Sequence, residues 1–251
     1  MVKRTLFLIY GLICYSFFLV SFVYAVGFVS NFFVPKSMDT GVTTSLSSAI
    51  LINLSLLGIF AVQHSVMARQ GFKKVWTKII PEPLERSTYV LFTSLALMLL
   101  FWQWQPINLV LWDLSDTVWS NVLWGLCVAG WLIVFFSTFV VDHFDLFGLR
   151  QVYLYFQEKE YEPIEFKKTL FYKYVRHPIL LGFIIAFWAT PIMSAAHLIF
   201  AGATLVYTFI GIFLEERDLV SIYGEQYQEY RKEVPMLVPK LPELNTQKSD
   251  A

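Results

Sequence analysis

The stretch that decides the fold begins with Tyr174-Val175-Arg176-His177-Pro178 and ends with Glu215-Glu216-Arg217-Asp218. Between these polar ends, residues 179–213 are almost entirely apolar. A run of about 35 residues is too long for one membrane-spanning helix, which needs about 20. Thr190-Pro191 lies near its middle, and proline disfavours helix in the residue before it. The stretch is therefore predicted to form a helical hairpin, with a shorter first helix to about residue 189 and a second over about 195–214, so that its polar ends meet.

Four further apolar runs precede the hairpin, over roughly residues 6–33, 46–67, 87–104 and 118–141. Each is long enough to span a membrane, and the first is too long for the core of a signal peptide, about 7–15 residues. Of the 251 residues, 57% are hydrophobic and 15% are charged, against about 25% charged in soluble domains. The predicted fold class is all-α: a polytopic membrane protein with about six transmembrane helices.

The basic residues are distributed unevenly between the predicted loops. With the N-terminus in the cytosol, the cytosolic segments hold 18 of the 19 Lys and Arg residues, and only Lys36 lies outside. Loops rich in Lys and Arg remain in the cytosol, so both termini and the stretch 142–178 are predicted to be cytosolic. A single membrane domain is expected over residues 1–242, followed by a disordered tail over 243–251.

Several classes of protein are disfavoured by the composition and motifs. The formal net charge is zero, which does not suggest a nucleic-acid partner. Cys14 and Cys127 both lie inside apolar runs, so we expect no disulfide framework. Asp142 and His143 could suggest a metal site, but the other histidines lie in separate segments, and we expect none. No Gly-x-Gly-x-x-Gly motif is present, which argues against a soluble Rossmann-type methyltransferase or dehydrogenase.

The polar ends of the hairpin carry the first candidate site. Arg176 and His177 directly precede a predicted helix that starts at Pro178, and a helix N-terminus with adjacent cations suits a carboxylate or phosphate. Interfacial anchoring is the alternative role for these side chains. Glu215 and Glu216 end the second helix, where acids oppose the helix dipole. They are therefore expected to face cationic side chains or a cationic ligand.

Three tyrosines and two histidines are further candidates. Tyr223, Tyr227 and Tyr230 are spaced as on one face of a helix, which serves either packing or stacking on a ligand. His143 stands between acidic residues at the cytosolic end of the fourth apolar run, and His64 lies near the same end of the second. Histidine titrates in the range that suits a general base. Simple structural hydrogen bonding is the alternative for both histidines.

Taken together, the motifs resemble those of a known enzyme superfamily. Arg176-His177-Pro178 with Gly182, then Glu215-Glu216 and Gly224-x-x-Tyr227-x-x-Tyr230-Arg231, resemble the C-terminal signature of the isoprenylcysteine carboxyl methyltransferases. Other motifs resemble the nurim-like branch of that superfamily and, within it, bacterial methanethiol S-methyltransferases. They are Gln63-His64-Ser65-x-Met67-Ala68-Arg69, Glu85-Arg86-Ser87-Thr88-Tyr89, Phe101-Trp102-Gln103-Trp104 and the run from His143 to Gln151. One departure is Leu180, where many members of the superfamily have tyrosine.

The resemblance implies an enzyme of the bacterial cytoplasmic membrane that uses S-adenosyl-L-methionine to convert a small thiol, methanethiol, into dimethyl sulfide. The residues that it implies for the cofactor are Arg176, His177, Pro178, Gly182, Glu215, Glu216, Tyr227 and Arg231. Because the thiolate is the reactive form and thiols have pKa values near 8.5, a base is expected. We predict His143 with Asp142 beside it, and His64 as second choice.

Three alternatives remain open. The substrate could be another thiol or an isoprenylcysteine-type compound. The chain could instead be a membrane reductase that uses NADPH, although no extra basic residues stand out for a 2′-phosphate. A non-enzymatic membrane protein similar to nurim is the third alternative. Such a protein would not need Arg176, Glu215 and Glu216 to converge.

Overall fold

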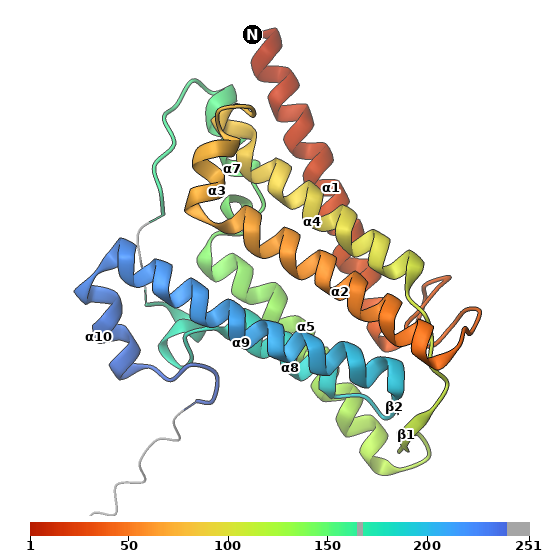
Figure 1. Ribbon diagram of the computed structural model, residues 1–251. Coiled ribbons are helices and arrows are strands. Elements are labelled where there is room, and N and C mark those ends of the chain that lie inside the picture. Colours follow the sequence, from red (N-terminus) through yellow and green to blue (C-terminus); the bar gives the residue numbers. More distant parts are fainter. Residues whose placement is uncertain (165–167, 240–251) are drawn as a thin grey trace, which may run out of the picture.

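The computed structural model describes residues 1–164 and 168–239 (Figure 1). Five of its helices are long and apolar enough to cross a membrane: α1 (Val2–Ser30), α2 (Leu46–Ala68), α4 (Glu82–Gln103), α5 (Val118–Val141) and α9 (Ala195–Tyr223). The shorter helices are α3 (Gln70–Trp76), α6 (His143–Leu146), α7 (Leu149–Phe156), the 3-10 turn η1 (Leu170–Lys173), α8 (Pro178–Trp188) and α10 (Glu225–Glu233). The chain is therefore an all-α polytopic membrane protein, as predicted.

The predicted hairpin is present, formed by α8 and α9. Its first arm, α8, has 11 residues, which rise only about 16 Å, against a hydrocarbon core of about 30 Å. Of the roughly six membrane helices predicted, five within the described residues are long enough to span, and the sixth, α8, is shorter, as predicted for the first arm of the hairpin. After α8 the chain continues in non-helical form through Pro191.

Two short strands at the hairpin turn were not predicted. Strand β1 (Val110–Asp113) pairs antiparallel with β2 (Ile192–Ser194), with Val110 opposite Ser194 and Asp113 opposite Ile192. Backbone N–H and C=O groups outside a helix still need hydrogen-bond partners. The two loops that contain β1 and β2 supply these partners to each other. The pairing ties the loop before α5 to the turn between α8 and α9.

Helix boundaries differ from the predictions at three places. The basic loop after α2 contains α3, and α4 begins at Glu82 rather than near residue 87, since Pro83 is tolerated in a first helical turn. Helix α9 continues beyond Glu215 to Tyr223 and is broken by Gly224, whose φ is 57°. Tyr223 therefore lies on α9, whereas Tyr227 and Tyr230 lie on α10, so the prediction of a single helical face is wrong.

The first arm of the hairpin, α8, packs closely against α5. A Cβ atom on Gly182 would lie 2.7 Å from the carbonyl oxygen of Gly130 and 2.9 Å from the backbone nitrogen of Val134. Only glycine permits such an approach of two helix backbones. Gly182, predicted to bind the cofactor, packs against α5 at this point.

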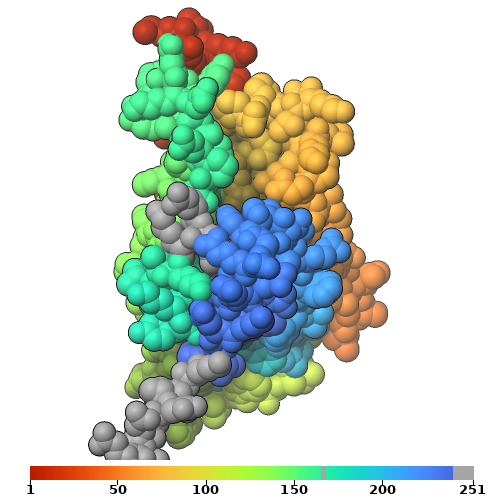
Figure 2. Space-filling model, turned by 90° about the vertical axis from the view of Figure 1, so that its left-hand side faces the viewer, coloured from red at the N-terminus to blue at the C-terminus, as the bar shows by residue number. Residues whose placement is uncertain are grey.

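The two ends of the bundle differ in character. The N-terminus, α3, α7 and α10 gather at one end, and β1 and β2 lie at the other (Figure 1). We call the first the motif end and the second the strand end. Ion pairs join distant segments at the motif end: Arg4 with Glu158 and Arg69 with Asp218. In the view of Figure 2, the red N-terminus, the green residues after α5 and the blue α10 share one face. The expected tail, residues 243–251, lies outside the described residues.

Candidate functional site

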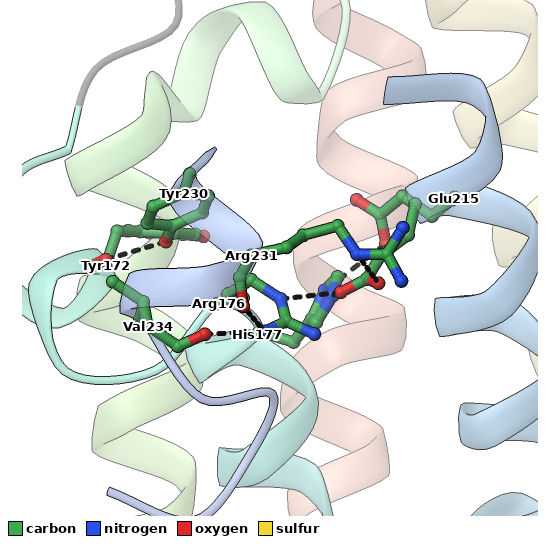
Figure 3. Close-up of polar contacts among 8 residues, drawn as sticks. Tyr172, Arg176, His177, Glu215, Tyr230, Arg231 and Val234 are labelled. Atoms are coloured by element: carbon green, nitrogen blue, oxygen red, sulfur yellow. Dashed lines mark hydrogen bonds and ion pairs between the residues drawn. The ribbon is translucent and has the colours of Figure 1, made fainter. Parts of the chain in front are cut away.

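The polar ends of the hairpin meet around the carboxylate of Glu216, and Figure 3 labels its partners Arg176, His177 and Arg231. Its Oε1 accepts from Arg176 Nε at 2.7 Å and lies 3.1 Å from His177 Nε2. Its Oε2 lies 3.0 Å from Arg231 Nε. We call Arg176, His177, Glu216 and Arg231 the Glu216 cluster. The predicted convergence of the two motifs is confirmed.

Three helices position the members of this cluster. His177 precedes the first residue of α8, Pro178, which is buried. Glu216 is in the last two turns of α9, and Arg231 is in the last turn of α10. Because Gly224 turns the chain sharply between α9 and α10, α10 folds back and its basic end reaches a carboxylate near the end of α9. Acids at this end of a helix oppose its dipole, and the cations beside Glu216 offset that effect.

Arg176 also holds the chain that follows α10. Its Nη1 donates to the carbonyl oxygens of Arg231, at 3.1 Å, and of Val234, at 2.5 Å. The backbone N–H of Arg176 donates to Pro235 O at 2.9 Å, and that of His177 donates to Met236 O at 3.2 Å. Arg176 and His177 were predicted to bind a ligand carboxylate. In the structure they contact mainly other parts of the protein, and they act as internal connectors between the start of α8 and the chain after α10.

The two adjacent glutamates have different surroundings, which the sequence did not distinguish. The side chain of Glu216 is only 5% exposed, whereas that of Glu215 is 53% exposed. Glu215 Oε2 lies 3.6 Å from His177 Nδ1, beyond hydrogen-bond distance. Figure 3 shows Glu215 close to the cluster. Of the pair, Glu215 is therefore the carboxylate that is accessible from solution.

A cavity of about 310 Å³ adjoins the cluster. Its polar end is formed by Glu216, Arg217 and Arg231. Its apolar lining comes from Phe209, Ile212, Phe213, Val220 and Met236. The side chain of Arg231 is 45% exposed, so a cation is accessible beside an apolar hollow. Such a combination suits a ligand with both charged and apolar parts.

The tyrosines of α10 are part of the packing around the cluster. Tyr227 and Tyr230 are buried, with ring centroids 5.7 Å apart. The Tyr230 hydroxyl donates to Tyr172 O at 2.6 Å. Burial raises the pKa of Tyr230 to about 12, so its hydroxyl stays protonated near neutral pH. Tyr227, predicted as a cofactor contact, lies in this packed layer.

His143 lies in a second buried cluster, formed by α1, α5 and α6. Its Nε2 lies 2.7 Å from the Tyr15 hydroxyl, and its Nδ1 lies 2.8 Å from Thr138 Oγ1. The Thr138 hydroxyl donates to Phe135 O at 2.7 Å, so it must accept from the imidazole, which places the proton on Nδ1. The Phe139 ring stacks on His143 at a centroid distance of 4.2 Å. We call Tyr15, Thr138 and His143 the His143 cluster.

The predicted orientation of His143 by an adjacent carboxylate is not seen. Asp142 Oδ1 instead accepts from the backbone N–H of Asp145 at 3.0 Å and caps α6. Asp145 pairs with Arg150 at 2.9 Å. Burial lowers the pKa of His143, and the charge of Asp142 acts in the opposite direction. The ring is therefore neutral at pH 7, and its orientation is set by hydroxyl groups.

His64 faces α4 and α9 from the motif half of α2. Its Nδ1 lies 3.0 Å from the Tyr89 hydroxyl, and its ring lies edge-on to Tyr207. The Tyr207 hydroxyl lies 3.2 Å from Ser65 Oγ. Tyr89 belongs to one of the sequence motifs, but the sequence suggested no role for Tyr89, and neither Tyr15 nor Tyr207 stood out. The signal available was a tyrosine inside an apolar run, since a buried tyrosine hydroxyl usually finds a polar partner.

No carboxylate or cysteine lies among these ring contacts. Within residues 1–164 and 168–239, no three His, Cys, Asp or Glu side chains gather as they would around a metal ion. The groups available at the motif end are thus a charged cluster beside a cavity, and two histidines held by hydroxyl groups.

Comparison with known proteins identifies relatives of this chain. A family model described as NnrU protein matches residues 51–238. Methanethiol S-methyltransferase of Crocosphaera subtropica is 57% identical over 94% of this chain and 93% of its own length. The enzyme of that name from Mycobacterium tuberculosis is 52% identical over 94% and 97%. Nurim of Mus musculus is 32% identical over 70% of each chain. No solved structure matches.

Proposed function

Because the chain belongs to the NnrU protein family, together with bacterial methanethiol S-methyltransferases, we propose that it methylates a small thiol, converting methanethiol into dimethyl sulfide. We propose S-adenosyl-L-methionine as the methyl donor. High identity over almost the full length of the bacterial relatives supports the reaction class. The observation that supports the cofactor is a pair of accessible opposite charges: Arg231 in the Glu216 cluster and Glu215 next to that cluster in the chain.

The amino-acid portion of the proposed cofactor carries one ammonium and one carboxylate. Arg176 and Glu216 neutralise each other inside the protein, whereas Glu215 and Arg231 are about half exposed. Glu215 would receive the ammonium and Arg231 the carboxylate, as charge-assisted hydrogen bonds. The apolar side of the cavity, which Arg231 also lines, would cover the less polar part of the ligand. When bound, the cofactor supplies a methyl group on a positively charged sulfur.

The chain's own task in the reaction is to remove the thiol proton and exclude water. At pH 7 most of an alkyl thiol is protonated, since its pKa is about 8.5 or higher. We propose His143 as the base, with Asp142 favouring its protonated form through charge. Because Nε2 already accepts the Tyr15 hydroxyl, the proton would reach the ring through that hydroxyl.

His64 is the second candidate for the base. Its ring faces α9 near Tyr207. Glu215 lies two turns further along α9 than Tyr207. A thiol bound between Tyr207 and Glu215 along α9 would then have His64 beside it.

We further propose that the motif end faces the cytosol. The basic segments and the candidate cofactor site are at this end, and a cytosolic cofactor requires that side. A cysteine substituted for Lys36 should react with an impermeant maleimide added to intact cells, and one at Lys74 should not. The opposite labelling pattern would reverse the orientation.

The decisive experiment is binding of labelled S-adenosylmethionine to the protein purified in nanodiscs, followed by a headspace assay for dimethyl sulfide with methanethiol. Saturable binding and a volatile product are expected. Product from an isoprenylcysteine-type compound but not from methanethiol would change the substrate. Binding of NADPH instead of the methyl donor would favour a reductase. Absence of all three would favour a non-enzymatic role similar to nurim.

A further inference from the structure

The segment of residues 69–81 joins the end of α2 to the start of α4. Both helices are long and apolar enough to cross a membrane, so the segment that connects them must lie at a membrane surface. Four basic residues occur in it, Arg69, Lys73, Lys74 and Lys78, and no acidic residue. We call it the basic segment. It contains α3 and continues as a turn through Ile80.

Two of the four basic residues face inward and have acidic partners. Arg69 Nη1 lies 2.9 Å from Asp218 Oδ2 on α9. Lys73 Nζ lies 3.9 Å from Glu85 Oε2 on α4. These pairs attach the basic segment to the bundle and fix which of its faces points outward.

The outward face combines charge with exposed apolar surface. Lys74 and Lys78 are exposed, and so are Val75 and Ile79, at 61% and 70%. Their spacing of three and four residues puts all four on one side of a helical segment. Within the described part of the chain, neither lysine has an ion-pair partner. In Figure 2 the orange-to-yellow region that includes α3 lies at the surface of the molecule.

We propose that this face binds the anionic headgroups of phospholipids, with Val75 and Ile79 inserted at the boundary between headgroups and acyl chains. At the end of a membrane span, lysines can contact the headgroups while neighbouring large apolar side chains contact the acyl chains. Anionic lipid attracts basic residues next to a membrane span. A water-soluble protein partner would have to compete with the bilayer itself, which lies directly beside the segment. The occupant is therefore the lipid.

Native mass spectrometry can measure this binding on the full chain. Protein delipidated in neutral detergent is titrated with phosphatidylglycerol and, separately, with phosphatidylcholine. Preferential retention of phosphatidylglycerol is expected. The double substitution Lys74→Gln and Lys78→Gln should weaken it about 30-fold, because each such lysine contributes about 1 kcal/mol and 1.4 kcal/mol is a factor of ten. High salt should weaken it as well.

The matched control substitutes Lys159→Gln and Lys232→Gln, two exposed lysines at the motif end that have acidic neighbours in sequence. This variant should retain phosphatidylglycerol as the parent chain does. Equal loss in both variants, or no preference between the two lipids in the parent, would overturn the proposal.

A fluorescent probe tests whether Ile79 is inserted into the lipid boundary. The Ile79→Cys variant carries an environment-sensitive fluorophore in nanodiscs that contain phosphatidylglycerol, with the parent chain as a blank because Cys14 and Cys127 are buried. The label should be shielded from a water-soluble quencher. Shielding that appears only in native membranes and not in nanodiscs would mean that a protein covers this face, and would contradict lipid binding. Neither measurement involves methyl transfer, so failure here is distinct from failure of the proposed enzyme activity.

Discussion

The Glu216 cluster and the His143 cluster both bury a histidine at the motif end, but they do so in different ways. Around Glu216 the contacts are ionic, and two charged side chains, Glu215 and Arg231, remain about half exposed. Around His143 the contacts are neutral hydroxyl groups and aromatic rings, and both imidazole nitrogens have partners. The first arrangement can exchange a partner with a ligand. The second can move a proton only along hydrogen bonds that already exist.

The largest effect should come from breaking the ionic cluster at its centre. Glu216→Gln leaves Arg176 buried without its counter-charge, and loss of one partner of a buried ion pair costs about 3–5 kcal/mol. The free energy of unfolding in nanodiscs should fall by that amount, and the chain after α10 should become sensitive to protease. A change of less than about 1 kcal/mol, the range of surface pairs, would show that the cluster is not essential for stability.

The second effect concerns the His143 cluster and is seen in turnover. His143→Ala should slow thiol methylation at pH 7 by about 100-fold, the low end of what a general base contributes. Cofactor affinity should not change, and raising the pH should restore part of the rate, because more thiolate then forms without a base.

His64→Gln is the matched comparison for that experiment. If His64→Gln shows the pH-dependent loss and His143→Ala does not, the base is His64 and the His143 cluster is structural. Wild-type turnover in both variants would remove the base from the mechanism.

A third prediction separates the two adjacent glutamates. Glu215→Gln should weaken binding of S-adenosylmethionine about tenfold, since a hydrogen bond to a charged group contributes about 1.5–3 kcal/mol. The melting temperature should stay near that of the parent chain, because the Glu215 side chain is 53% exposed. Equilibrium binding to the purified protein measures the first quantity, and thermal unfolding measures the second.

His177→Ala is expected to weaken binding as well, since it removes the group next to Glu215. Unchanged affinity in folded Glu215→Gln and His177→Ala proteins would refute the cofactor site. Loss of stability in Glu215→Gln comparable to that of Glu216→Gln would erase the distinction between the two residues.

The smallest effect is the pH dependence of stability. The folded-state pKa of His143 lies below its ordinary value of 6.5, so the unfolded chain takes up a proton first as the pH falls. The stabilising contribution is complete above pH 6.5 and is lost as the pH falls toward the folded-state pKa. Thermal unfolding between pH 7.5 and 5 should show this slope, and His143→Gln should reduce it. An identical slope in both proteins would mean that His143 titrates normally.

Much of the fold followed from local sequence properties. The spans of α2 and α5 were predicted to within about one residue, because a membrane helix needs a continuous apolar run whose ends are visible in the sequence. The hairpin followed from the length of the run around Pro191, and its polar ends meet as expected. The paired strands β1 and β2 were missed because neither has a pattern that stands out from a loop.

The site was predicted only as a set of residues. Arg176, His177, Glu215 and Glu216 were identified from the motifs, and the structure brings them together. Their division into connectors and exposed groups was not predictable, because it depends on carbonyl oxygens from residues 231 to 236 that fold back over α8. Likewise, Tyr15 lies 128 positions from His143 in the sequence.

By itself, the sequence determined that this chain lies in a membrane, which apolar runs form its spans, and which residue types meet at the hairpin ends. These depend on hydropathy and on chain length, which are local quantities. Only the tertiary structure decided that Glu216 is an internal counter-ion while Glu215 faces outward, and that Gly182 packs on Gly130. The physical reason is that burial and hydrogen-bond partners are set by neighbours far away in the chain, so two identical adjacent side chains acquire opposite environments on one helix.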